Sequence, residues 1–249
     1  MNTDHTIAIL GYNHHDITLR NIRHLRDTGC TDRILLWDNG SDPAYTPLAA
    51  DLPGVECRRE EHNRFVNPVW NDLIESCGTR YLTLLNNDCF VLSPGYFDEV
   101  TAHMALENFA LTSTKTLRVG RMPQRLRLGP IRRIAGTRPL RWKTRARRQG
   151  WLMTIDLHQY RACAPYRIPD YLRLWFGDDW IWYRVISAGR TSAIYTNRFA
   201  LHLDFPVSIT GSMNDVVEAD KAALAKYGDW HREYLPVIHC RTRLWSRYV

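Results

Sequence analysis

Residues 81–91 read YLTLLNNDCFV, and this stretch decides the fold. An uncharged apolar run ends there in three polar residues, and a short apolar segment follows before Pro94-Gly95. A short run bounded by turn residues is typical of a buried strand. Asp88 then lies at the edge where open α/β sheets bind ligands, and a carboxylate beside two amides suits a hard divalent cation carrying a phosphorylated ligand. Taken alone, Asn86 to Asp88 are more typical of a polar turn.

The composition is that of a globular chain with a basic surface. Its 249 residues are 45% apolar, enough for one large α/β domain, and no run of 18 apolar residues predicts a transmembrane helix. The first residues lack the profile of a signal peptide. The six cysteines have no closely paired spacing, which favours reduced thiols in a cytoplasmic protein and argues against a zinc site. The net charge of +7 favours a polyanionic partner or surface.

Strands and helices alternate through the first 92 residues. Apolar runs predict strands at residues 6–11, 33–37 and 55–58, ahead of the strand in residues 81–91. Periodic apolar positions predict helices at residues 16–28 and 67–77, the second with Asn67 as its cap and Pro68 at its first position. This alternation predicts an α/β fold in which a mostly parallel central sheet with right-handed crossovers is flanked by helices.

The second half opens with a predicted strand at residues 109–114 and then changes composition. No acidic residue occurs from Asn108 to Ile155, whereas eleven arginines lie between Arg118 and Arg148. Glycine and proline break this window repeatedly, so we interpret residues 108–150 as an ordered or partly ordered excursion. Regular structure resumes with strands at residues 151–155 and 191–196, helices near residue 159 and at residues 178–187 and 212–227, and a basic, aromatic C-terminal helix or tail.

Four polar clusters fall at predicted strand ends, in an order that resembles the GT-A fold, nucleotide-sugar glycosyltransferases of the large family-two branch. In the first half the matching segments are Ile7–Asn13, Asp38-Asn39-Gly40-Ser41, Asn71 and Leu85-Asn86-Asn87-Asp88, the last a common version of the D-x-D motif. In the second half they are Gly150–Met153, Gly177-Asp178-Asp179 with Arg184 and Gly189, and Ala200-Leu201-His202 with Ser208. The resemblance covers residues 6–208 without the basic excursion, and the ordered set is more specific than any single motif.

The resemblance implies a nucleoside-diphosphate sugar as donor and Mn²⁺ or Mg²⁺ as cofactor, because a Lewis acid neutralises the departing diphosphate. Asp88 would hold the metal, with Asn86 and His202 as further ligands. Asn86 replaces the first acidic residue of the motif, so we expect weaker metal binding. Nucleotide contacts are expected from Asn13, Asp38, Asn71 and Asn87. Local sequence equally allows Asp38 to be a turn former, and His202 to be a histidine packed near a strand end.

The acceptor hydroxyl needs a base, and Asp178 or Asp179 would take its proton. By resemblance Asp179 is the better candidate, and the reaction is an inverting single displacement. An acidic pair at a helix start is also stabilised by the helix dipole, so one residue can cap while the other catalyses. The resemblance implies a single domain, in which residues 6–92 bind the nucleotide sugar, residues 108–150 face the acceptor and residues 151–249 complete the acceptor half.

The arginine-rich excursion lies where this fold commonly shapes the acceptor site. A basic surface there predicts an anionic acceptor, contacted by Arg132, Arg133, Arg147 and Arg148. DNA with a hydroxymethylated base fits, since GT-A-like enzymes of that kind are associated with phages and base-modification systems and extrude their target base. A cell-envelope glycan or lipid-linked intermediate, with the arginines on anionic lipid in a peripheral membrane contact, is the rival. A solvated basic loop without a partner is the third interpretation.

A non-catalytic alternative also fits the sequence. The chain would then be a nucleic-acid-binding module on a decayed transferase fold, and the replacement of an acidic residue by Asn86 leaves this open. The presence of Asp88, Asp179 and His202 argues against it. Hydrolysis of nucleotide sugars in the presence of metal separates the two, because a decayed module would show none.

Overall fold

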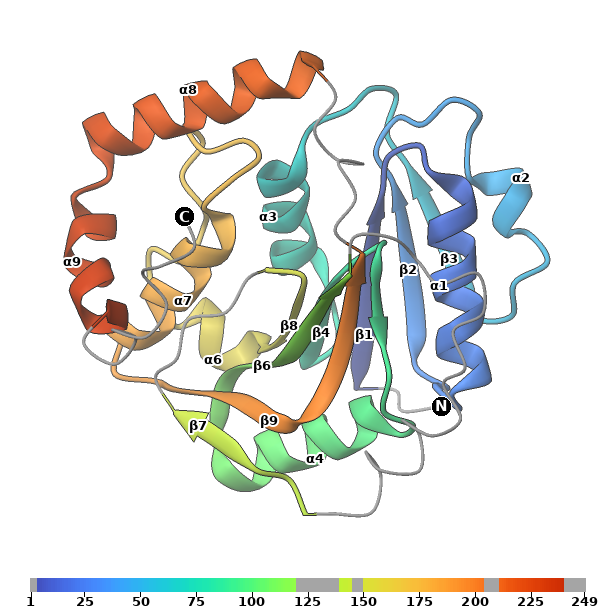
Figure 1. Ribbon diagram of the computed structural model, residues 1–249, viewed down its shortest axis with the longest axis horizontal. Helices are drawn as coiled ribbons and strands as arrows, with labels where there is room; N and C mark the ends of the chain where they lie inside the picture. The colour runs from blue at the N-terminus through green and yellow to red at the C-terminus, as the bar shows by residue number, and fades with distance from the viewer. Residues whose placement is uncertain (1–3, 120–138, 145–149, 204–210, 240–249) are drawn as a thin grey trace.

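The computed structural model describes residues 4–119, 139–144, 150–203 and 211–239, and these build one central sheet with helices on both faces (Figure 1). The strands are β1 (His5–Gly11), β2 (Arg33–Asp38), β3 (Val55–Arg59), β4 (Tyr81–Asn86), β5 (Cys89–Val91), β6 (Phe109–Val119), β7 (Trp142–Thr144), β8 (Leu152–Asp156) and β9 (Thr191–Leu203). The helices are α1 (His15–Asp27), α2 (Thr46–Ala49), α3 (Val66–Ser76), α4 (Tyr96–Glu107), α6 (Leu157–Arg161), α7 (Gly177–Ser187), α8 (Gly211–Tyr227) and α9 (Asp229–His239).

The sheet is mixed, as the sequence predicts. Its order is β3-β2-β1-β4-β8-β6-β9-β5, with β7 paired to β9. The first four strands are parallel, as are β6 and β9, while β4 with β8, β6 with β8, β5 with β9 and β7 with β9 are antiparallel. Gly11 is paired with Asp38, and Leu10 with Asn86. This register brings the carboxyl ends of β1, β2 and β4 together, which is where parallel sheets bind ligands.

Apolar residues on alternate positions of the strands feed two cores. Ile7 and Ile9 of β1 pack with α1 and α4 on one face, whereas Ala8 packs with α3, α6, α7 and α9 on the other. Both faces of the central strands are therefore covered, which explains their near-continuous apolar sequence. In Figure 1, α1 and α3 lie on opposite sides of β1 and β2, and α8 lies above α3 and α7, at the end of the molecule where α1 starts.

Several elements differ from the sequence-based expectations. Residues 81–91 form two strands, because β5 leaves β4 and pairs with β9. β6 and β9 are longer than expected because they pair with each other past a register shift at Thr114 and Lys115. α4 is an additional helix, whose sequence signal is the spacing of Phe97, Val100 and Met104.

The prediction that Asn67 caps α3 is wrong. The helix begins at Val66, and the cap position is Phe65, whose φ is +66°. The Asn67 side chain instead donates to the carbonyl of Trp175, 108 residues away. Every helix within the described ranges falls short of the length and apolar character needed to span a membrane.

Candidate active site

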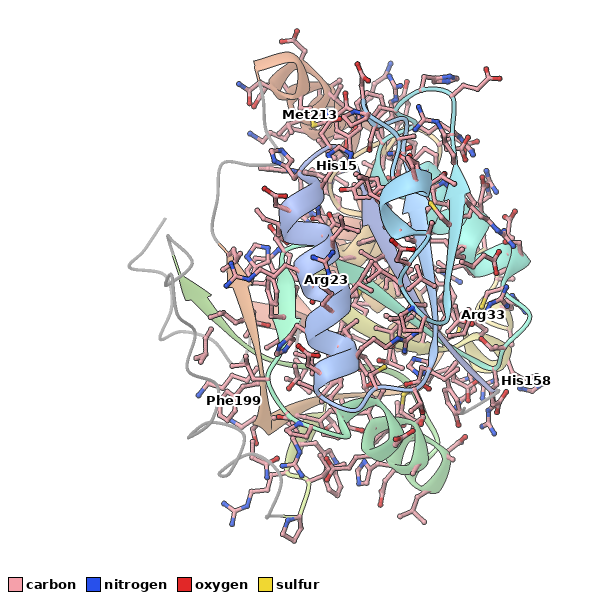
Figure 2. The ribbon with its side chains drawn as sticks, turned by 90° about the vertical axis from the view of Figure 1, so that its right-hand side faces the viewer. His15, Arg23, Arg33, His158, Phe199 and Met213 are labelled. Carbon is pink, nitrogen blue, oxygen red and sulfur yellow. The ribbon has the colours of Figure 1, made fainter. Side chains whose placement is uncertain are left out.

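A pocket lies at the carboxyl ends of β1, β2 and β4. Its lining residues are Leu10, Tyr12, His14, Asn39, Asn63, Phe65, Val66, Trp70, Asn86, Asn87, Asp88, Leu174 and Met213. Figure 2 shows Met213 of α8 and His15 of α1 at the same end of the molecule, and His158 of α6 far from them. The three polar residues at the end of β4 and in the turn after it, Asn86, Asn87 and Asp88, are therefore pocket residues.

Asp88 and His202 meet at the edge of this pocket. The antiparallel pairing of β5 with β9 sets Cys89 opposite His202, and the Leu203 amide donates to the Asp88 carbonyl at 3.1 Å. His202 Nε2 lies 3.3 Å from Asp88 Oδ1, and the two residues are 8% and 4% exposed. Trp151 stacks on the His202 ring at 3.8 Å, with 10° between the ring planes, which fixes its orientation.

This arrangement fits a divalent cation. Asp88 Oδ1, which lies 3.3 Å from His202 Nε2, and His202 Nδ1 are both buried without a hydrogen-bond partner among the described residues, and a bound ion or water can satisfy such atoms. No cluster of three or more His, Cys, Asp or Glu ligands occurs in the part of the chain that the structure describes. The protein thus offers one carboxylate, one imidazole and the Asn86 amide, which suits a metal that takes its other ligands from substrate phosphates and water.

A polar stripe on the buried side of α1 holds the turn that contains Asp88. Thr18 Oγ1 accepts from Asn87 Nδ2 at 3.0 Å, and His24 Nε2 lies 2.6 Å from the carbonyl oxygen of Val91. Asn21 Nδ2 lies 3.3, 3.1 and 3.0 Å from the carbonyl oxygens of Asn86, Asn87 and Cys89. Sequence reasoning missed this stripe, whose signal is the three-residue spacing of Thr18, Asn21 and His24 on an otherwise apolar helix face.

Asp38 lies beneath the pocket rather than in its wall. It is fully buried, and its carboxylate accepts from Ser41 N at 2.8 Å, Tyr45 N at 3.0 Å and Arg59 Nη1 at 2.7 Å. These bonds organise the turn after β2, in line with the turn-forming interpretation. The next residue, Asn39, is the one that lines the pocket.

Asn13 connects the turns after β1 and β2. Its backbone N–H donates to Ser41 Oγ at 2.9 Å, and its side-chain Oδ1 accepts from the backbone N–H of Asp42 at 3.0 Å. Burial raises the pKa of Tyr45 to about 12, so its phenol keeps its proton and donates to the Asn13 carbonyl. Asn13 is therefore next to two pocket residues, Tyr12 and His14, without lining the pocket itself.

Asn71 is also outside the pocket lining. Its Oδ1 accepts from Ile168 N at 2.8 Å and its Nδ2 donates to Ile168 O at 2.9 Å. The pair of bonds ties α3 to the loop before α7. Of the four residues expected to contact the nucleotide, only Asn87 lines the pocket. The polar and aromatic pocket residues that sequence reasoning missed include Tyr12, His14, Asn39, Asn63 and Phe65.

The two acidic residues at the start of α7 have different surroundings. Asp179 is 1% exposed, and its Oδ2 lies 3.6 Å from Nε2 of His231 in α9. Asp178 is half-buried beside Gly150, where an added Cβ would lie 2.7 Å from Asp178 Cβ and 2.9 Å from Trp70 Cη2. Because Trp70 lines the pocket, Asp178 lies close to the pocket wall. Arg132, Arg133, Arg147 and Arg148 lie outside the described residues.

Comparisons with known proteins agree with this architecture. The model of glycosyl transferase family 2 matches residues 6–171. A crystal structure of GalNAc-T7 with UDP, GalNAc and Mn²⁺ superposes with a TM-score of 0.61 at 13% identity, over 90% of this chain. The matched region is 50% of the length of that protein chain. No curated protein sequence matches the chain. Since the family model covers most of the sequence, the chain belongs to glycosyl transferase family 2.

Proposed function

We propose that the protein transfers a sugar from a nucleoside-diphosphate sugar to an acceptor hydroxyl, with Mn²⁺ or Mg²⁺ as cofactor. The observation that carries this proposal is the contact between Asp88 and His202 at the mouth of the pocket, with unsatisfied polar atoms on both side chains. The family match supports the reaction class, and the structural neighbour was itself solved with UDP, GalNAc and Mn²⁺.

Asp88 and His202 would hold the metal, and the bound metal would neutralise the diphosphate as it leaves. Trp151 keeps the His202 imidazole in one orientation, and the α1 stripe keeps the Asp88 turn in place. Asn86 contributes a neutral carbonyl oxygen at most, so Asp88 carries the formal negative charge of this turn. Loss of that one carboxylate is therefore expected to remove most of the protein's affinity for the metal.

The nucleoside would lie against the wall formed by the turns after β1 and β2. Tyr12, His14 and Phe65 supply rings there, and Asn39 and Asn63 supply amides. Asn39 Nδ2 donates to Asn63 Oδ1 at 2.8 Å, and Asn39 Oδ1 accepts from the Arg64 amide at 3.0 Å. Asn39 Nδ2 also donates to Phe65 O at 3.2 Å, so the Asn39 amide is fixed in orientation and holds this wall in the shape that a nucleoside would meet.

The base that activates the acceptor would be one of the two carboxylates at the start of α7. The position of Asp178 beside Trp70 and Gly150 supports Asp178, whereas the family resemblance supports Asp179. Asp179 faces His231, which suits a residue that orients α7 against α9. We therefore assign the base to Asp178 and an orienting role to Asp179. Attack by the activated hydroxyl in a single displacement inverts the anomeric carbon.

We further propose an anionic acceptor, with DNA containing a hydroxymethylated base as the leading candidate. Support comes from the sequence, where the window from Asn108 to Ile155 has eleven arginines and no acidic residue. A cell-envelope glycan or lipid-linked intermediate is the alternative acceptor, with the arginines on anionic lipid.

The donor is tested by a thermal-shift panel of nucleotide sugars, each with and without Mn²⁺. The correct donor should stabilise the protein by mass action and only with metal, and metal-dependent hydrolysis should follow. Absence of both with every donor would leave a non-catalytic module. The acceptor is tested by transfer from the identified donor to DNA containing 5-hydroxymethylated pyrimidines, read by mass spectrometry of the nucleosides. Unmodified nucleosides from an enzyme that hydrolyses its donor would leave the glycan acceptor.

A further inference from the structure

The segment of residues 173–175, which leads into α7, has its backbone bound from two sides. From α8, the carboxylate of Asp220 accepts three amide hydrogens: Oδ1 from Arg173 N at 2.9 Å, and Oδ2 from Leu174 N at 2.7 Å and Trp175 N at 2.8 Å. Asp220 is 1% exposed. A buried carboxylate that accepts several backbone N–H groups is a strong and specific anchor, because it is charged and its lone pairs are satisfied.

Asn67 of α3 binds the carbonyl side of the same segment. Its backbone nitrogen donates to Arg173 O at 2.9 Å, and its Nδ2 donates to Trp175 O at 2.9 Å. Asn67 is 1% exposed. Two residues from two helices therefore bind five backbone groups of three consecutive residues. In Figure 1 the loop before α7 runs beneath α8 and beside α3, as this arrangement requires.

This segment lies between the pocket and the acidic pair of α7. Leu174 lines the pocket, and α7 with its acidic pair begins only two residues after Trp175. Asn67 also touches that beginning, since an added Cβ at Gly177 would lie 2.0 Å from Asn67 Oδ1. Phe176 between them has a φ of +64°, a conformation that persists only where the surroundings enforce it.

We propose that Asp220 and Asn67 are positioning residues that set the acidic pair of α7 at its working distance from the Asp88 turn. Neither touches the pocket, so they act through the segment of residues 173–175. The inference rests on the proposed function, since it concerns where the acceptor's base stands. A displacement of about 1 Å in a reacting group is enough to cost on the order of 10²-fold in rate.

The test is Asp220→Asn, which keeps the shape but turns one acceptor oxygen into an NH₂ group facing an N–H group. We expect turnover to fall on the order of 10²-fold while Mn²⁺-dependent binding of UDP, read by titration calorimetry, stays close to wild type. Asn67→Ala should give the same split, and it keeps the test available where Asp220→Asn does not fold. Turnover is measured below the melting transition of each variant.

Two control variants separate positioning from stability. Glu218→Gln removes an exposed carboxylate of the same helix, which forms an ion pair with Lys221, and it should change nothing. Asp156→Asn removes a fully buried carboxylate that binds Arg80 and the Gln159 amide at the opposite end of β4. It should lower the melting temperature but leave the turnover of folded enzyme unchanged.

Turnover of Asp220→Asn and Asn67→Ala near the wild-type rate, or a fall equal to that of Asp156→Asn, would overturn the positioning role. UDP binding that fell as steeply as turnover would also overturn it, because the donor site would then have collapsed too. A wild type that hydrolyses no nucleotide sugar would instead refute the proposed function, and the inference with it. The two failures are therefore distinguishable in one set of measurements.

Discussion

The two sides of the proposed active site, one for the donor and one for the acceptor, are built in different ways. On the proposed donor side, β1, β2 and β4 end at one edge in a register that pairs Gly11 with Asp38 and Leu10 with Asn86, and α1 contacts the Asp88 turn. On the proposed acceptor side, the acidic pair is held by contacts between residues far apart in the sequence, such as that of Asp179 with His231. The comparison teaches that the proposed donor side follows mainly from strand order, with His202 added by the pairing of β5 with β9, whereas the proposed acceptor side depends on a few long-range anchors.

The largest expected effect is on the donor side. Asp88→Ala should abolish transfer and metal-dependent donor binding, because Asp88 carries the only formal charge in the Asn86–Asp88 turn. EDTA should silence the wild type in the same way, and activity should return with excess Mn²⁺. Near-normal activity of Asp88→Ala in Mn²⁺ would show that other residues hold the metal, and the metal site proposed for the donor side would be wrong.

A second large effect concerns the acceptor side. Asp178→Asn keeps the shape of the side chain but cannot accept a proton, so turnover should fall on the order of 10²-fold or more while donor binding remains. Asp179→Asn should be milder and should lower thermal stability, because Asp179 faces His231. Steady-state rates and melting curves of the two variants measure both effects. The reverse ranking of rates would move the base to Asp179.

A third test sharpens the comparison by asking what the acceptor side binds. Replacing Arg132, Arg133, Arg147 and Arg148 together by alanine should weaken binding to duplex DNA at low salt. It should also make the slope of log K against log salt less negative, by about 0.9 for each phosphate that the variant no longer neutralises. Donor hydrolysis without acceptor should hardly change, since these arginines lie outside the nucleotide motifs. The cell-envelope acceptor would be favoured if DNA binding by the wild type did not depend on salt and the four-alanine variant lost binding to anionic liposomes.

The smallest expected effect tests the support of the metal turn. Asn21→Ala removes the donor shared by three carbonyl groups of that turn, and such supporting residues typically change metal affinity about tenfold or more. Titration of Mn²⁺ in the presence of UDP measures the change. Arg23→Ala, on the exposed side of the same helix (Figure 2), is the matched control. Equal affinities for the two variants would mean that β4 and β5 alone hold the turn.

The sequence predicts that Asp88 lies at the edge of the sheet, because the polar residues that end a buried strand must lie there. It does not predict Asn21, since a polar residue on an amphipathic helix usually faces solvent and only the folded chain shows it facing carbonyl groups. Asp38 illustrates a different limit, because the residues that take up its carboxylate lie three to twenty-one positions away. Because Asp38 is buried in these bonds, Asn39 is the residue of the Asp38-Asn39-Gly40-Ser41 motif that lines the pocket.

For the acidic pair, for Asn67 and for His202, the sequence predicts the helices and strands but not the contacts between them. The helix of the acidic pair is predictable from its apolar spacing, whereas the position of Asp178 beside Gly150 and the contact of Asp179 with His231 are known only from the folded chain. Asn67 fits a helix cap in every local respect, and only the loop before α7 gives it another role. The pairing of His202 with Asp88 could be expected from the family motifs, but its cause is the long-range pairing of β5 with β9.

The most direct test of the central claim is the thermal stability of the wild type with a nucleoside diphosphate, measured in Mn²⁺ and in EDTA, beside His202→Ala. If Asp88 and His202 hold the metal that carries the diphosphate, UDP or its correct counterpart should raise the melting temperature only in Mn²⁺. The rise should shrink in His202→Ala, although residue 202 lies more than a hundred positions from Asp88. An equal rise in EDTA, or an undiminished rise in His202→Ala, would contradict the account.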